Sequence, residues 1–252
     1  APLALDAEAR WRVDPGALAA APASTRAVVV VHPNNPTGHL LHPDDHRMLV
    51  EWCRDHDAAL VADEVFLPYP LHPETPTTSL AGDGCLTFTL GGLSKSVGLP
   101  QLKLAWIAVD GPEAERSEAL ARLDWVADAY LSVSAPVAAA AAELLERGEA
   151  VHGAILARCR ANLAALSSAV ERLPAVELAR PDGGWSAVLR VPNVLPEEEL
   201  ALRLLAEGVA VHPGFLFDFP SDGWLVLSLL APEATHAAGV ARLVATLAEL
   251  VG

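Results

Sequence analysis

The two lysines of this chain lie close together in the sequence, at Lys95 and Lys103. The 17 lysines and arginines include only these two lysines, so almost every other fixed positive charge is an arginine. A lysine amine can lose its proton and attack a carbonyl carbon, whereas a guanidinium stays protonated. Lys95 ends the segment Gly91-Gly92-Leu93-Ser94-Lys95, and glycines let a backbone approach a ligand closely. The sequence therefore predicts a nucleophilic amine at Lys95, with a surface loop lysine as the alternative.

Polar residues also come directly after two apolar runs. Ligand-binding residues often have this position, directly after a buried strand. Asp63 comes directly after the run 59–62, and Asn35 lies in the turn Pro33-Asn34-Asn35-Pro36-Thr37-Gly38 after the run 27–32. An unpaired carboxylate at a buried strand end is costly, so Asp63 needs an internal arginine or a ligand cation, such as a protonated ring nitrogen. The asparagines offer amide donors in a turn stiffened by two prolines, although a plain connection has the same composition.

The pattern of the first half predicts an α/β sheet. Apolar runs that end in polar residues indicate buried strands at 27–32, 59–62, 86–90 and 104–109. A helix over 42–56, with acidic residues in its first turn, separates the first two strands. Sheets of this kind bind ligands at the carboxyl ends of their strands.

The pattern changes after Pro112. Alanine- and leucine-rich segments with helical spacing occupy 113–122, 135–147 and 151–173. Shorter strands then return at 176–178, 186–191, 209–212 and 225–229, with helices at 196–207 and 232–250. We therefore expect a large α/β domain over 1–150 and a smaller α+β domain over 151–252.

Composition excludes several classes of protein. A hydrophobic content of 52% with 19% charged residues is typical of a soluble globular chain. The net charge of −15 argues against partners such as nucleic acid or an anionic membrane. Charges interrupt the apolar stretches, so we expect no transmembrane helix. The chain begins at Ala1 without a signal-peptide pattern, and we expect a longer parent.

Neither the cysteines nor the histidines indicate a metal site. The three cysteines are far apart in the sequence and fit neither a disulfide framework nor a metal spacing. We interpret them as buried free thiols of a reducing, cytoplasmic compartment. His42 and His46 are four residues apart, which can hold a metal on a helix, but Pro43 and the adjacent acids favour a helix start instead.

The asparagine turn, the strand-end aspartate and the glycine-flanked lysine occur in this order, each after a strand. Together they resemble the class I/II aminotransferases, which are pyridoxal-phosphate enzymes of fold type I. The resemblance runs from Trp11 to the C-terminus, while the N-terminal part of a typical member has no counterpart. It implies a three-layer sandwich with a mostly parallel sheet that binds the cofactor, and a smaller C-terminal α+β domain.

The resemblance also implies roles for individual residues. Lys95 matches the lysine that forms the internal aldimine and moves the substrate proton, and Ser94 precedes it in the cofactor loop. Asp63 matches the aspartate that pairs with the pyridine nitrogen, and Asn35 the asparagine that binds the phenolic oxygen. Lys103 falls where the family usually places an arginine on the phosphate; a lysine offers a charge there without the bidentate fork.

Several positions depart from the family pattern. Phe66 stands in the cofactor site where many members have a tyrosine, so the hydroxyl contact to the phenolic oxygen is lost. Gly92 replaces a common phosphate-binding serine. Val226 takes the place of the arginine that clamps the substrate carboxylate. Arg190, by strand position, is the candidate to bind that carboxylate instead. His212 lies in a segment that resembles the small-domain loop that approaches the substrate, which makes it a candidate for substrate binding, with a packing turn as the alternative.

The resemblance implies an enzyme, an aminotransferase that moves an amino group between an amino acid and a 2-oxo acid, working as a homodimer. Trp125 and Tyr130 lie where the family often faces its dimer partner, with a place in the core as the equal alternative. Two alternatives remain open: a pyridoxal-phosphate C–S β-lyase, and a non-catalytic or truncated binding module that exposes apolar faces.

Overall fold

The computed structural model describes residues 3–5, 10–82, 84–130, 132–219 and 221–251. It divides into two compact units. Unit 1 comprises residues 1–34, 39–68 and 76–152, and unit 2 comprises residues 35–38, 69–75 and 153–252. The main boundary thus falls between His152 and Gly153, and two short segments from the first half of the chain join unit 2.

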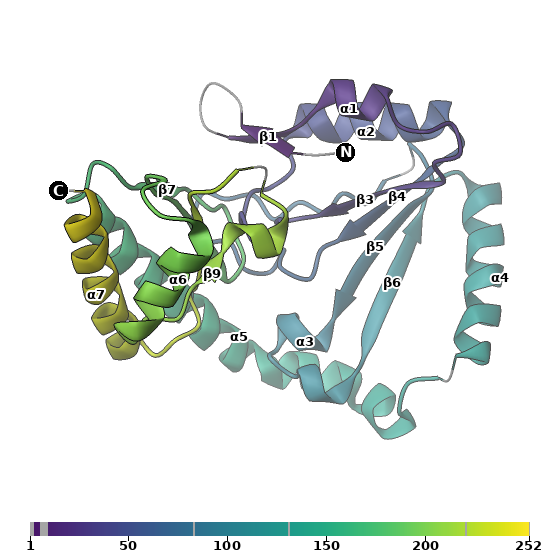
Figure 1. Ribbon diagram of the computed structural model, residues 1–252. Helices are drawn as coiled ribbons and strands as arrows, with labels where there is room; N and C mark the ends of the chain where they lie inside the picture. The colour runs from purple at the N-terminus through teal and green to yellow at the C-terminus, as the bar shows by residue number, and fades with distance from the viewer. Residues whose placement is uncertain (1–2, 6–9, 83, 131, 220, 252) are drawn as a thin grey trace. The chain divides into compact units, whose positions relative to one another are not determined.

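Unit 1 is built on a four-stranded sheet with the order β3-β4-β5-β6 (Figure 1). The strands are β3 (Ala27–Val31), β4 (Ala59–Asp63), β5 (Thr87–Gly92) and β6 (Ala105–Asp110). The first three are parallel, and β6 runs antiparallel to β5. This is the mostly parallel α/β sheet that the sequence predicts, and the carboxyl ends of its parallel strands share one edge.

The outer strands of this sheet are more exposed than the sequence predicts. In the central strand β4, Leu60 and Ala62 are completely buried. In β3 the side chain of Val29 is 68% exposed, and in β6 Trp106 and Ile107 are exposed. The prediction of fully buried strands is therefore wrong for β3 and β6. Both are edge strands, so among the described residues each has a strand neighbour on one side only.

Helix α2 (Pro43–Asp55) packs on one face of the unit 1 sheet (Figure 1). His42 caps it, because its Nδ1 accepts a hydrogen bond from the Asp44 N–H. A short hairpin of β1 (Leu3–Leu5) and β2 (Trp11–Val13) precedes it, followed by α1 (Pro15–Ala19). None of these three elements is evident from the sequence pattern.

A buried ion pair holds the hairpin against α2. Arg12 donates to both carboxylate oxygens of Asp45, with distances of 2.9 Å from Nε and 2.7 Å from Nη2, and the Val13 N–H donates to the same carboxylate. Burial raises the pKa of Asp45, but the Arg12 and Val13 hydrogen bonds outweigh it and the net pKa is lowered. Removing Arg12 would leave a buried charge unpaired, so this contact strongly constrains where β2 lies.

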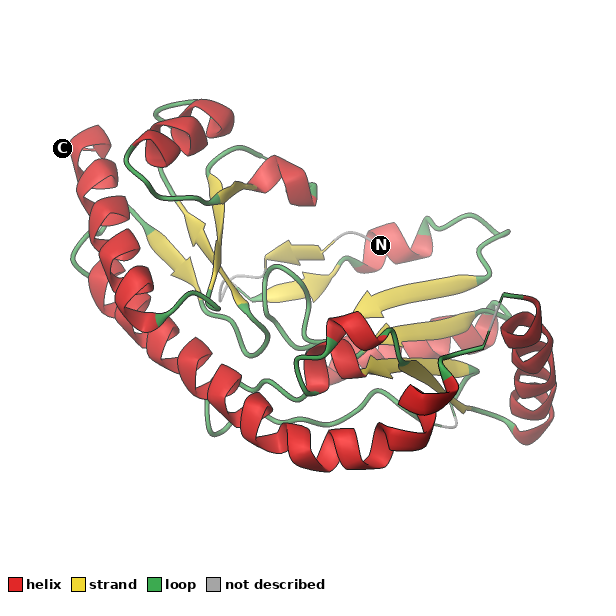
Figure 2. Cartoon of the chain, turned by 90° about the horizontal axis from the view of Figure 1, so that it is seen from below, coloured by secondary structure: helices red, strands yellow, loops and turns green. Residues whose placement is uncertain are grey.

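Two helices follow the unit 1 sheet. Helix α4 spans Glu113–Ala129, and α5 spans Ala135–Val170 as one continuous helix (Figure 2). The prediction of two helices there is wrong. Gly148 weakens the helical pattern, but it is needed for packing: a Cβ at this position would overlap the side chain of Val97.

Unit 2 contains an antiparallel sheet with the order β7-β8-β10-β9. Its strands are β7 (Glu177–Ala179), β8 (Ser186–Arg190), β9 (His212–Pro213) and β10 (Trp224–Ser228). Residues with side chains on one face join the hydrophobic core of the unit, among them Leu189, Leu225 and Leu227. Because side chains alternate along a strand, the residues between them lie on the other face.

Helices α6 (Glu197–Ala206) and α7 (Glu233–Val251) complete unit 2 with the second part of α5. The buried carboxylate of Glu197 accepts hydrogen bonds from the backbone N–H groups of Trp224, at 2.7 Å, and Phe215, at 3.0 Å. These bonds fix the start of α6 against β10.

Contrary to the expectation for apolar stretches, α7 is long and apolar enough, by length and composition alone, to cross a membrane. Its Val240, Leu243 and Leu247 are buried in the core of unit 2. One face of this helix therefore packs in the core of unit 2.

Candidate active site

Asp63 is the last residue of β4, at the carboxyl edge of the unit 1 sheet. Its backbone lies opposite Val31 of β3 and Leu90 of β5. Its half-buried side chain accepts a hydrogen bond from the Val65 N–H at 3.1 Å. The adjacent Glu64 lies apart from it, because its carboxylate accepts from Ser79 Oγ and from the Leu80 N–H. The two neighbouring carboxylates therefore do not form a pair.

Lys95 lies in the short helix α3 (Leu93–Ser96), which begins directly after β5. The Leu93 side chain is fully buried, and its N–H donates to the Leu104 carbonyl at 3.0 Å. On the other side of Lys95, the Val97 side chain fits against Gly148 of α5. Since both flanking residues are anchored, the position of Lys95 is set by packing and not by the lysine itself.

The side chain of Lys95 is half-buried and turns toward Phe66. Its Nζ lies 5.7 Å from the centroid of the Phe66 ring, within the range of a cation–π contact. Phe66 is buried and follows Asp63 by three residues. In the sequence, Phe66 indicates only that a tyrosine hydroxyl is lost. In the structure, its ring contacts the lysine amine. No sequence signal indicates that contact.

Asp63, Phe66 and Lys95 thus come together at one edge of the unit 1 sheet, at the ends of two adjacent parallel strands. Ser94 precedes Lys95 in α3 and is half-buried. Glycine at position 91 is required there, because a Cβ would overlap the Trp106 side chain of the neighbouring β6. A groove of about 330 Å³ adjoins this edge, lined by Glu64, Leu90, Gly91 and Trp106 among others.

Lys103 follows the 3₁₀ helix η1 (Pro100–Leu102), which packs against α3. Its side chain is exposed and its backbone is left-handed, with φ of 54°. Few non-glycine residues adopt this conformation. Its role on a phosphate stays a prediction.

Asn35 lies in the turn after β3, and its side chain is exposed. The peptide bonds before Pro33 and Pro36 are cis. The Gly38 carbonyl accepts hydrogen bonds from the N–H groups of Asp182 and Gly183, both at 2.9 Å, which joins the segment 35–38 to unit 2. Gly38 has φ of 72°, and a Cβ there would lie 2.8 Å from the Gly183 carbonyl oxygen. The assigned role of Asn35 also stays a prediction.

In unit 2 the two candidate substrate-binding residues, Arg190 and His212, lie on the strands on either side of the strand that carries Val226. This valine is 3% exposed and lies directly opposite Val188 of β8 and His212 of β9. Arg190 of β8 lies opposite Trp224, and its guanidinium carbon is 4.7 Å from the centroid of the Trp224 ring. Directly opposed residues of antiparallel strands share a face, and so do residues two apart. Arg190 and His212 therefore lie on the same face as Val226, on either side of β10.

His212 has an exposed side chain, and its ring meets that of Phe217 edge to face, with centroids 6.0 Å apart. Phe217 ends the 3₁₀ helix η2 (Gly214–Phe217). The face that carries Arg190 and His212 is the one opposite the hydrophobic core. The sequence alone gives Arg190 only by strand position, and the register of β8, β10 and β9 relates it to His212.

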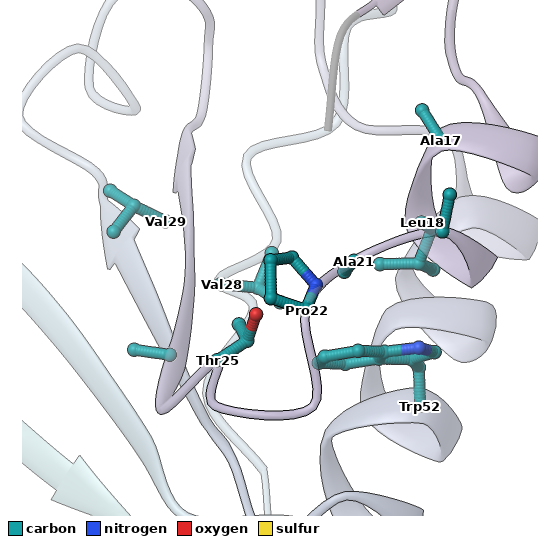
Figure 3. Close-up of a pocket in the computed structure, with 10 residues that line it drawn as sticks. Ala17, Leu18, Ala21, Pro22, Thr25, Val28, Val29 and Trp52 are labelled. Atoms are coloured by element: carbon teal, nitrogen blue, oxygen red, sulfur yellow. The ribbon is translucent and has the colours of Figure 1, made fainter.

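Another pocket of unit 1, of about 340 Å³, lies at the amino end of β3 (Figure 3). It is lined by α1 and its following loop, the start of β3, and Trp52. The described residues that line it carry no ionisable side chain, in contrast to the carboxyl edge of the sheet, where Asp63 and Lys95 lie.

A strand-end lysine and carboxylate on a mostly parallel sheet, joined to a second α+β unit, define a class of enzyme that comparison with known proteins identifies. Residues 1–243 match the family described as aminotransferase class I and II, and the chain belongs to this family.

Three relatives illustrate the similarity. The alanine aminotransferase of Mycobacterium tuberculosis is 28% identical over 229 residues, covering 87% of this chain and 53% of the relative. The capreomycidine synthase of Streptomyces vinaceus is 32% identical and covers 77% of the chain and 49% of the relative. The crystal structure of tyrosine aminotransferase from Leishmania infantum superposes with a TM-score of 0.85 at 20% identity, over 97% of this chain and 62% of that one. The chain spans about half the length of these curated relatives.

Proposed function

We propose that this chain carries the catalytic lysine of a pyridoxal-phosphate-dependent aminotransferase that moves an amino group between an amino acid and a 2-oxo acid. The observation that carries the proposal is the position of Lys95 and Asp63 at the ends of two adjacent parallel strands, with the Lys95 amine over the Phe66 ring. Membership of the aminotransferase family supports it.

The donor set of this edge fits pyridoxal phosphate. A primary amine is available to join an aldehyde, and a carboxylate is available to hold a protonated pyridine nitrogen. When bound, the cofactor supplies an aldehyde for amines and a ring that withdraws electrons from the substrate α-carbon. Lys103 offers a cation for a phosphate, without the bidentate geometry of arginine.

The residues of the chain then have distinct tasks. The Lys95 amine would act as the nucleophile and then, as a free amine, carry the proton from the substrate α-carbon to C4′ of the cofactor. With the cofactor bound, the negative charge of Asp63 would stabilise a positive charge on the pyridine nitrogen. Phe66 covers one side of the lysine amine and keeps water from it. Asn35 would donate its amide N–H to the phenolic oxygen of the cofactor.

The substrate carboxylate needs a cation, and Val226 cannot supply one. We assign this task to Arg190 and His212, which lie on the same sheet face as Val226. An arginine binds a carboxylate through two hydrogen bonds, whereas a histidine does so only when protonated.

Borohydride reduction with pyridoxal phosphate present tests the proposal directly. We expect the pyridoxyl group to be fixed on Lys95, and peptide mapping by mass spectrometry to find it there. Lys103→Arg is the matched control and should keep the label, whereas Lys95→Arg should lose it. Labelling of Lys103 alone, or of neither lysine, would contradict the proposal for this chain.

The reaction class needs a separate assay. We expect an amino acid to lose its amino group only when a 2-oxo acid is added as acceptor. Pyruvate released from cysteine or cystathionine without an acceptor would instead identify a C–S β-lyase. A chain that binds the cofactor and does neither would be a non-catalytic binding module.

We also propose that the chain forms a homodimer through α4. Trp125 and Tyr130 at the end of this helix are 78% and 81% exposed, which is unusual for large apolar side chains. Light scattering should give twice the chain mass for the wild-type protein. The double variant Trp125→Ser and Tyr130→Ser should shift the mass toward a monomer, and an unchanged mass would exclude this face.

A further inference from the structure

Two of the three cysteines, far apart in the sequence, meet in the hydrophobic core of unit 1. Cys53 lies in the last turn of α2 and is completely buried, and Cys85 precedes β5 and is 4% exposed. Both belong to the same cluster of buried residues. Cys159 is buried in the separate core of unit 2. The sequence analysis gives all three as buried free thiols, but not that two of them are neighbours.

Contacts with the start of β4 show why they meet. The Cys53 thiol donates to the Ala59 carbonyl, with Sγ and O 3.7 Å apart, and the Cys53 carbonyl accepts from the Ala58 N–H at 2.9 Å. The next residue of β4, Leu60, donates its N–H to the Leu86 carbonyl, also at 2.9 Å. Both cysteines therefore lie beside the start of β4. Helix α2 places Cys53 next to Ala59, and Leu86, the residue after Cys85, pairs with Leu60.

The two thiols have different chemical character. The nearby Cys53 side chain lowers the pKa of Cys85 to about 6, against the opposing effect of burial, and Thr87 adds to this. The Cys85 side chain, together with burial, raises the pKa of Cys53. Cys85 is therefore the more acidic thiol of the pair. A thiolate beside a second thiol is the arrangement of a peroxide-sensitive cysteine and its resolving cysteine.

A groove on the surface of unit 1 lies near this pair. Thr87 Oγ1 lies 3.6 Å from Cys85 Sγ. Thr87 also lines a groove of about 270 Å³, together with the exposed Gly82 and Gly84. Thr87 is therefore the residue of this groove that lies next to Cys85.

We propose that Cys53 and Cys85 form a reversible disulfide when the chain meets a hydroperoxide. The Cys85 thiolate attacks one peroxide oxygen, the O–O bond breaks, and the leaving oxygen takes a proton to become an alcohol or water. The Cys53 sulfur then attacks the Cys85 sulfenic acid, loses its proton, and the S–O bond breaks to release water. The two sulfurs supply two electrons, the hydroperoxide accepts them, and a dithiol reverses the reaction.

The test compares the three cysteines within the wild-type chain. The reduced protein is exposed to hydrogen peroxide, unfolded, alkylated and mapped by mass spectrometry. Burial raises the pKa of Cys159 to about 11, so this cysteine is the internal control. We expect a Cys53–Cys85 cross-linked peptide, with Cys85 consumed at least about tenfold faster than Cys159. Equal rates for the two, or oxidation of Cys85 without a cross-link, would overturn the proposal.

Variants separate the two steps. In Cys53→Ser we expect Cys85 to stop at the sulfenic acid, which dimedone traps. In Cys85→Ser we expect Cys53 to stay reduced, and in Cys159→Ser the cross-link should form as in the wild type. If either Ser variant fails to fold, the wild-type comparison still decides, since it requires no substitution. A cross-link that involves Cys159 would also contradict the proposal.

Discussion

The two sheets of this chain carry their chemistry in different ways. In unit 1 the two residues proposed for the chemistry, Asp63 and Lys95, lie at the ends of adjacent parallel strands. In unit 2 the position of the usual arginine holds Val226, and the available cations belong to the two strands beside it.

The difference follows from sheet geometry. At the carboxyl edge of a parallel sheet, the residues that follow neighbouring strands lie close together. A residue placed elsewhere along its strand therefore does not reach the site. On the face of an antiparallel sheet, side chains of neighbouring strands lie about 5 Å apart, so a cation can come from either neighbour. We therefore expect substitutions at the unit 1 edge to have larger effects than those on the unit 2 face.

The largest expected effect is that of Lys95→Arg. Arginine keeps the positive charge over the Phe66 ring but cannot act as a nucleophile or release its proton. We expect turnover to fall by about 10³-fold or more, since a positioned proton-transfer group alone contributes about 10²–10⁴-fold. Steady-state kinetics with an amino acid and a 2-oxo acid measures this. Lys103→Arg is the matched control, and equal losses in the two variants would contradict the special place of Lys95.

The acid stability of unit 1 gives the next largest effect, through His39, the residue after the turn. Burial, and then the neighbouring His32, lowers the pKa of His39 to about 4, while Asp45 raises it in part. The unfolded value is about 6.5, so the unfolded chain binds the proton more readily. The contribution of His39 to stability is therefore complete above pH 6.5 and is lost as the pH falls toward 4, by about 3 kcal/mol in total.

Replacing His39 by asparagine should flatten this pH dependence. We expect the free energy of unfolding of His39→Asn, measured with urea, to change less between pH 7 and pH 4.5 than that of the wild type. His56→Asn, at an exposed position after α2, is the matched substitution with which His39→Asn is compared. In unit 2, burial lowers the pKa of His236 in the same direction, so His236→Asn tests whether unit 2 shares this sensitivity. An unaltered slope in His39→Asn would exclude the mechanism.

The third effect distinguishes two adjacent carboxylates. Asp63→Asn removes the negative charge that is proposed to hold the cofactor nitrogen, and hydrogen bonds to charged groups contribute about 1.5–3 kcal/mol. We expect cofactor affinity, measured by absorbance titration, to fall by about 10- to 100-fold. Glu64→Gln is the control, because this side chain accepts hydrogen bonds from Ser79 and Leu80 instead. A larger loss for Glu64→Gln would reverse the assignment of roles.

Much of unit 1 could be predicted because its signals are local. The apolar runs before Asp63 and Lys95 place both residues after strands, and parallel strands then bring them to one edge. The exposure of Val29 and Trp106 could not be predicted, since it depends on which strands lie at the sheet edges. The continuity of α5 was missed because Gly148 weakens the helical pattern, while the packing of Val97 that requires it is not local.

The contacts of side chains were harder to predict than the elements. Nothing in the sequence relates Phe66 to Lys95, or Cys53 to Cys85, because each pair is joined by the order of strands. In unit 2 the strand β9 has only two residues, His212 and Pro213, and its pairing with β10 sets the face of His212. A pattern of two residues has no period, so sequence alone could not give that face.

The smallest expected effect concerns the two cations of unit 2, and it decides which of them replaces the arginine. Arg190 is fully charged but lies over the Trp224 ring, whereas His212 is directly opposite Val226 and is charged only when protonated. Because His212 is the nearer of the two to the Val226 position, we expect His212→Asn to raise KM for the 2-oxo acid severalfold with little change in kcat. Such a pattern indicates lost binding and not lost chemistry.

Arg190→Gln is the paired variant on the other side of β10. If His212 binds the carboxylate, Arg190→Gln should leave KM nearly unchanged. A KM change confined to Arg190→Gln would assign the carboxylate to Arg190. If neither variant changes KM, the face around Val226 does not bind the substrate carboxylate. The two sheets then differ in function and not only in geometry.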